Sequence, residues 1–126
     1  MKIRNITIGI QSLEEGAKEL VAAVNAFQEG RPYTKTSPDV CFASLDAVRN
    51  VLTPKRLELL RLIRELEPDS IYELARAAKR DLKNVQGDVS LLARIELVSL
   101  SNSKTRRRRV IPRVGYDRIQ FQISVV

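Results

Sequence analysis

The chain begins with a period-two pattern and then changes to a helical one. Apolar and polar residues alternate over residues 3–10, which predicts a half-buried strand. Over residues 13–27 apolar residues recur every three or four positions, as on one side of an amphipathic helix. Ser12 and Glu15 have the spacing of a capping box at its start, and Gly30 marks its end. We therefore expect a strand followed by a helix.

Shorter elements are expected before residue 53. Residues 31–39 contain two prolines, two threonines and a serine, which is typical of a surface loop. A short strand over residues 40–43 follows, and then a brief helix capped by Ser44. Cys41 lies in this apolar strand, so we expect a buried structural thiol rather than a reactive one.

From Thr53 onward the pattern predicts a helix, with Thr53 as N-cap and Pro54 at the first helical position. Pro68 closes this helix. Its apolar stripe is Leu57, Leu60, Ile63 and Leu66. These residues are expected to face the core.

Two further helices are predicted. The first is short and starts with a capping box at Ser70 and Glu73. The second begins at Asp81 and ends near Ile95. Its apolar positions 82, 85, 89 and 92 are expected to face the core. Its outer surface is therefore polar.

Strands complete the pattern. Residues 98–100 and 110–114 predict an antiparallel hairpin around a basic loop, and residues 119–125 predict an amphipathic strand that pairs with residues 3–10 or with a partner's strands. Helix, short helix, turn, longer helix and hairpin is the order of a winged helix-turn-helix. We expect an α+β fold in which residues 51–126 form a winged helix-turn-helix domain, with three helices and a hairpin wing, and residues 1–50 form a strand-helix extension.

Four segments resemble a known family. They are residues 52–60, 70–75, 83–85 and 88–89, within a similarity that covers residues 42–123. The chain resembles the MarR-type winged-helix transcriptional regulators, in particular a small prokaryotic and archaeal group regarded as DNA-binding. The resemblance implies a winged helix that binds duplex DNA as a dimer. It implies no operator sequence.

The charge is concentrated in the second part of the chain. The net charge is +7, yet residues 1–50 contain six basic and six acidic side chains, so the excess lies beyond residue 50. The densest run, residues 104–109, has five basic side chains in six positions. Arginine forks match phosphate oxygens, so a phosphate-binding loop is the leading interpretation. The alternatives are a solubilising cluster and a contact with a membrane surface or an acidic protein.

The predicted DNA-binding residues come from three places. The turn before the last helix supplies Lys79 and Arg80, and the hairpin loop supplies Lys104, Arg106, Arg107, Arg108 and Arg109. The outer surface of the helix itself supplies Lys83, Asn84, Gln86, Gly87, Ser90 and Arg94. Asn and Gln amides can bond to an adenine edge, although the same residues also suit an ordinary polar surface.

Several neighbouring residues receive structural interpretations. Gly87 either permits a close approach to DNA or is a tolerated surface glycine, and related proteins tend to carry a polar side chain there. Asp88 is expected to pair with a basic neighbour such as Lys83 or Arg94. On the helix after Thr53, a solvated surface with short-range ion pairs is expected for Lys55, Arg56, Glu58, Arg61, Arg64 and Glu65.

Composition excludes several classes of chemistry. The chain has no His and one Cys, so zinc sites, Ser-His-Asp triads and Cys-His dyads lack their residues. We expect no enzyme, cofactor or metal. The sequence shows neither a signal-peptide core nor a membrane span, so a soluble cytoplasmic protein is expected.

These observations favour a sequence-specific regulator, and in particular a repressor, that binds double-stranded DNA. Residues 1–50 would serve dimerisation or partner binding. One alternative is an antitoxin-like interaction protein that regulates its own synthesis through the winged helix and binds a toxin through residues 1–50. Another is a nonspecific nucleic-acid-binding protein. The few aromatic residues, three Phe and three Tyr, argue against stacking on single strands.

Overall fold

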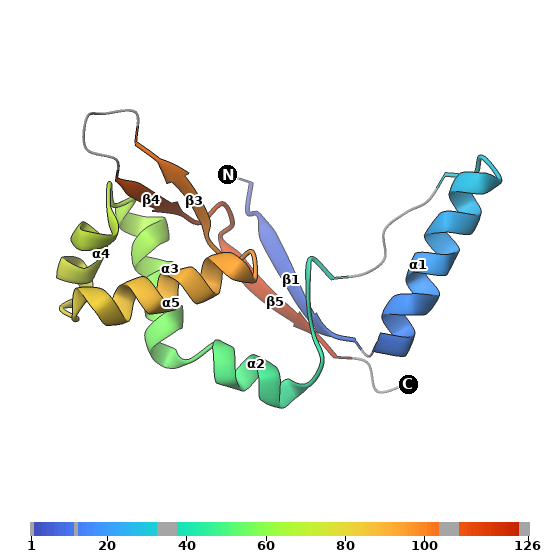
Figure 1. Cartoon of the computed structure of the whole chain (residues 1–126), viewed down its shortest axis with the longest axis horizontal. Coiled ribbons are helices and arrows are strands. Elements are labelled where there is room, and N and C mark those ends of the chain that lie inside the picture. The colour runs from blue at the N-terminus through green and yellow to red at the C-terminus, as the bar shows by residue number, and fades with distance from the viewer. Residues whose placement is uncertain (1, 12, 33–37, 104–108, 124–126) are drawn as a thin grey trace.

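A computed structural model describes residues 2–11, 13–32, 38–103 and 109–123 (Figure 1). The first half contains strand β1, helix α1, strand β2 and helix α2, with the bounds Asn5–Ile10, Leu13–Gln28, Val40–Phe42 and Leu45–Val51. Three helices follow, α3 (Pro54–Leu66), α4 (Ile71–Ala78) and α5 (Leu82–Arg94). The last elements are the strands β3 (Ser99–Asn102), β4 (Val110–Arg113) and β5 (Arg118–Gln122). The fold is a mixed α+β fold, as predicted.

Helix starts follow the predicted caps. The side chains of Ser44, Thr53 and Ser70 each accept a hydrogen bond from the backbone N–H three residues later. Asp81 does the same for α5, at 3.4 Å. At α4 the reciprocal bond differs from the predicted capping box, because the Glu73 carboxylate accepts from the backbone of Asp69 rather than of Ser70. The predicted cap Ser12 lies outside the described residues.

Strand β1 occupies the centre of a three-stranded sheet, with β2 and β5 parallel to it on either side. Ile8 lies opposite Val40 on one neighbour and Phe121 on the other. The two terminal strands therefore pair with each other, which was one of the two predicted alternatives. A separate antiparallel pair, β3 and β4, forms the predicted hairpin.

The core lies between the sheet and the helices. Ile8 and Phe42 from the sheet belong to one buried cluster with residues of α3, α4 and α5. The predicted inward positions of α5 are correct, since Val85, Val89 and Leu92 are buried. Figure 1 shows α3, α4, α5 and the hairpin together at one end of the molecule, with α1 extending from the other.

Two expectations about burial are wrong. Leu57 and Leu66 were expected to face the core, yet their exposed fractions are 43% and 55%, because the buried side of α3 is formed by Leu59, Leu60 and Ile63. Cys41 is exposed rather than buried. Alternation along β2 buries Phe42 and turns Cys41 to the opposite side of the sheet, where its thiol donates to the Gln11 side chain.

Helix α1 forms where the pattern predicts it, and Ala26 is buried, but the larger apolar residues of the helix are exposed. Leu20, Val21, Val24 and Phe27 are all exposed, with Phe27 at 87%. Packing of α1 against other described elements is slight. Within the described residues, no helix is both long enough and apolar enough to cross a membrane.

Candidate nucleic-acid interface

Helix α5 has one buried and one open side. Its buried side packs against α4 through Val85, Val89 and Leu92. The predicted contact residues in its first three turns are all exposed: Lys83, Asn84, Gln86, Gly87 and Ser90. The side chains of Lys83, Asn84 and Gln86 make no hydrogen bond or ion pair with any other described residue, and Asn84 is bonded to Asp81 only through its backbone N–H. Their polar groups are therefore available to an external partner.

The helical geometry arranges these residues in a definite order. Lys83, Gly87 and Ser90 follow one line along α5, because they are separated by four and three residues. Asn84 and Gln86 are two residues apart, so they lie about 160° apart around the axis, on opposite flanks of this line. The two amides therefore point away from α5 in different directions.

Gly87 lies at the centre of the exposed side. A Cβ added there would meet no described heavy atom within 4 Å. Packing inside this chain therefore does not require a glycine, although glycine costs roughly 1 kcal/mol relative to alanine in a helix interior. Both predicted interpretations, a close approach by DNA and a tolerated surface glycine, remain compatible with this space.

Arg94 is exposed like the others but lies at the far end of the helix. It is about 16 Å along the axis from Lys83. There it lines a cavity of about 380 Å³ with Asp39, Glu96 and the strand β2. The structure thus separates Arg94 from the polar residues in the first three turns of α5.

The two predicted phosphate contacts in the turn before α5, Lys79 and Arg80, have different surroundings. Lys79 ends α4 in the left-handed conformation, at φ 56°, and its side chain is exposed. Arg80 is instead committed to an internal ion pair, because its Nη2 donates to Asp88 at 2.8 Å and its side chain is only 21% exposed. The prediction that Arg80 is free to bind phosphate does not agree with this geometry.

Asp88 joins α5 to two arginines from other parts of the chain. Besides Arg80, it accepts from Arg56 Nε at 3.1 Å, and Arg56 Nη1 also donates to the carbonyls of Asn50 and Val51. The expected pairing of Asp88 with Lys83 or Arg94 is wrong, as is the solvated position expected for Arg56. The cluster fixes α5 relative to α3 and the preceding turn, which holds the outer side of α5 in place.

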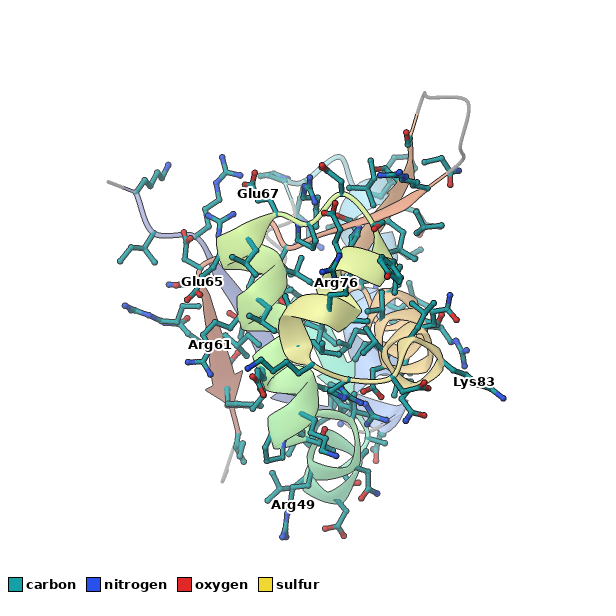
Figure 2. The ribbon with its side chains drawn as sticks, turned by 90° about the vertical axis from the view of Figure 1, so that its left-hand side faces the viewer. Arg49, Arg61, Glu65, Glu67, Arg76 and Lys83 are labelled. Atoms are coloured by element: carbon teal, nitrogen blue, oxygen red, sulfur yellow. The ribbon has the colours of Figure 1, made fainter. Side chains whose placement is uncertain are left out.

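Of the basic residues predicted in the hairpin loop, Arg109 is the one that the structure describes. The Ser103 N–H donates to the Arg109 carbonyl at 2.8 Å, continuing the β3–β4 ladder, and Arg109 is exposed. Lys104, Arg106, Arg107 and Arg108 lie outside the described residues. In Figure 2, Lys83 extends from α5 on the side of the molecule where the hairpin rises, and Arg61 lies on the opposite side.

Sequence reasoning missed a contribution from α4. Arg76 and Tyr72 line a cavity of about 420 Å³ with Arg109 of the hairpin, and the Arg76 guanidinium carbon lies 6.0 Å from the centre of the Tyr72 ring. The helical spacing of α4 could have predicted this position. Leu74 and Ala75 face the core, which leaves Tyr72 and Arg76 on the opposite side of the helix. Arg76 adds an exposed positive charge between α4 and the hairpin (Figure 2).

A second polar cluster secures the sheet to α3, away from this surface. Arg64 donates from Nε to Asp117 at 3.0 Å, and Arg4 donates its backbone N–H to the other carboxylate oxygen. The backbone hydrogen bond from Arg4, followed by that from the Arg64 side chain, lowers the pKa of Asp117. Burial raises the pKa of the neighbouring Tyr116 to about 12, and its hydroxyl donates to the Leu97 carbonyl. Both groups are structural.

The described chain is thus a mixed α+β protein in which α3, α4, α5 and the hairpin lie at one end, and α5 has an exposed polar surface (Figure 1). The family model HVO_A0114 matches residues 51–121, so the chain belongs to the HVO_A0114 family. This family is uncharacterised, and the resemblance to MarR-type regulators stays a prediction. No curated protein matches the chain.

Proposed function

We propose that the chain is a winged helix-turn-helix protein that binds double-stranded DNA sequence-specifically and represses transcription. Helix α5 would enter the major groove, while the hairpin would contact the backbone or the minor groove. The chain would act as a homodimer, because paired half-sites supply affinity that one small module lacks. The resemblance to MarR-type regulators supports the same proposal.

One observation carries the proposal. The open side of α5 presents an ammonium group and two amides, on Lys83, Asn84 and Gln86, with no partner for them among the described residues. Amides suit adenine edges, and a lysine suits guanine or phosphate. The buried side of the same helix is held by the core and by the Asp88 cluster, so the open side is presented rigidly.

The surrounding charge supports binding to a polyanion. Lys79 and Lys83 flank the start of α5, and Arg76 and Arg109 lie between α4 and the hairpin. Each lysine or arginine that neutralises a phosphate releases counterions, so binding weakens as salt increases. The net charge of +7 agrees with such a partner.

The test is a titration of the purified protein against its own upstream DNA and a random duplex of equal length, at two salt concentrations. We expect tighter binding to the upstream DNA. Asn84→Ala and Gln86→Ala should each cost roughly 1–3 kcal/mol on that DNA and much less on the random duplex. Lys83→Ala should lower the salt slope by about 0.9 if it contacts one phosphate.

Asn25→Ala provides the matched control, because Asn25 is an exposed helical asparagine on α1. It should leave both affinities unchanged. Equal losses on the two duplexes would make Asn84 and Gln86 positioning residues and contradict base reading. Equal, salt-sensitive binding of the unaltered protein to both duplexes would indicate a nonspecific nucleic-acid-binding protein.

A further inference from the structure

Helix α1 has two sides with different surroundings. The side that is covered within the chain carries small residues, since Ala26 is 4% exposed and Gly16 and Ala23 are half-buried. Glu19 lies on the same side and accepts a hydrogen bond from Gln11 Nε2 at 3.1 Å. Contacts within the chain therefore use this side of α1 and leave its large apolar residues exposed.

Four exposed apolar residues of α1 follow the spacing of a coiled coil. They are separated by three, four and three residues: Ala17, Leu20, Val24 and Phe27. Alternating steps of three and four residues are those of the a and d positions of a heptad, which pack against another helix. The four residues lie within about 80° around the axis, about 100° from the covered side. We call them the α1 seam.

A coiled-coil seam packs against a helix that has an apolar side of its own to offer. The other described helices already bury residues of that side in the core: Val48 on α2, Leu59 on α3, Leu74 on α4 and Val89 on α5 are each 5% exposed or less. Figure 1 shows α1 standing apart from α3, α4 and α5. A second copy of the chain supplies a helix with the same spacing and the same exposed side.

The charges of α1 bear on the direction in which two such helices pair. Residues 14–19 carry three glutamates and one lysine, whereas residues 20–28 carry no charge. The charged residues lie outside the seam, so they do not disturb its apolar contact. In a parallel pair the two acidic ends would lie side by side and repel each other. In an antiparallel pair each acidic end lies beside a neutral one, and the helix dipoles are opposed.

Side-chain sizes along the seam also match in the antiparallel direction. At its centre Leu20 would lie opposite the partner's Val24. One step outward, Ala17 would face the partner's Phe27, so the smallest residue of the seam meets the largest. A parallel pair would instead place Phe27 against Phe27 and Ala17 against Ala17, which crowds one layer and leaves another empty. Val21, 57% exposed, flanks the seam and would lie beside the partner's Val21.

We propose that α1 pairs with α1 of a second copy of this chain along the α1 seam, as an antiparallel helix pair with two-fold symmetry. The seam spans about 15 Å from Ala17 to Phe27. Because a contact of this length is smaller than a standard interface, the dimer should have a dissociation constant in the micromolar range. The inference rests on the homodimer of the proposed function but not on DNA binding.

The first test is sedimentation velocity at tens of micromolar, with folding checked by circular dichroism. The unaltered chain should form a dimer. Ala17→Glu should leave the chain monomeric at the same concentration, because it places a charge in the apolar seam. Ala22→Glu is the matched control, since Ala22 is an exposed alanine on the side of α1 opposite the seam, and this variant should remain dimeric. Dissociation by both variants, or by neither, would contradict the proposed seam.

Cysteine cross-linking tests the direction of the pair. Leu20→Cys and Val24→Cys are made separately in a Cys41→Ser background, which removes the natural thiol. An antiparallel pair brings position 20 of one chain to position 24 of the other, so a mixture of the two variants should form a disulfide on oxidation. Neither variant alone should cross-link efficiently, because its two thiols lie about 6 Å apart along the axis. Cross-linking of each variant with itself would indicate a parallel pair and contradict the proposal.

Other positions for the seam are separated by two further results. Leu57→Glu, at an exposed position of α3, should remain dimeric, and a monomer would show that the seam packs on α3 instead. An unaltered chain that stays monomeric at tens of micromolar would overturn both the helix pair and the proposed homodimer, and would leave the seam for a different protein. Failed DNA binding by an intact dimer would affect only the proposed function.

Discussion

Helices α5 and α1 have similar sequence patterns, but the apolar side of α5 is buried and that of α1 is exposed. Both are amphipathic and contain a glycine, yet α5 buries Val85, Val89 and Leu92, whereas the apolar stripe of α1 is open. Periodicity therefore predicts that a helix has an apolar side, but not what covers it. Among the described residues, the polar side of α5 and the apolar side of α1 are both exposed.

The largest expected difference between the two helices is in how much their apolar residues contribute to the free energy of unfolding. Leu92→Ala should lower the free energy of unfolding by about 2–5 kcal/mol, because it leaves a cavity in the core. Val24→Ala should change it by less than about 0.5 kcal/mol when the chain is monomeric. Urea denaturation followed by circular dichroism, at submicromolar concentration, measures both. Similar losses for the two variants would show that α1 packs on its own chain.

A smaller effect is expected from the ion pairs. Asp88→Asn should lower the free energy of unfolding by about 2 kcal/mol, because it leaves two partly buried guanidinium groups without their carboxylate. On α1, the Lys18–Glu14 pair is almost fully exposed, so Lys18→Ala should leave stability unchanged. The same denaturation experiment tests both variants. An unaffected Asp88→Asn would mean that the cluster does not secure α5.

The smallest expected change in the free energy of unfolding comes from replacing two helical glycines, Gly87 and Gly16, which have open space around them. Gly87→Ala should raise the free energy of unfolding by about 1 kcal/mol, since α5 unfolds with the core. Gly16→Ala on α1 should raise it less, because α1 is weakly coupled to the rest of the monomer. DNA titration of Gly87→Ala then separates its two interpretations. Weaker binding indicates a close approach, and unchanged binding indicates a tolerated surface glycine.

Local features were the ones that the sequence predicted well. The caps at Ser44, Thr53, Ser70 and Asp81 are confirmed, because an N-cap depends on a side chain and a backbone group only three residues apart. The inward positions of α5 are confirmed for the same reason, since they follow from its period.

Partners distant in the sequence were harder to predict. Spacing suggested Lys83 or Arg94 for Asp88, whereas one actual partner, Arg56, is 32 residues away on another helix. Leu57 was expected in the core because it matches the helical period, yet the buried side of α3 is rotated toward Leu59. Of the candidate surface, the predicted residues of α5 up to Ser90 came from the sequence, while Arg76 emerged only from the packing of α4 beside the hairpin.

The pairing of β1 with β5 has a consequence for the order in which the chain folds. The backbone and side-chain bonds between Arg4 and Asp117 span 113 residues, which is most of the length of the chain. Closing such a loop costs entropy before its contacts contribute, so the sheet should form late, after the short-range helices α3, α4 and α5. During synthesis β1 must wait for β5 to leave the ribosome, and its unpaired edge is exposed to aggregation until then.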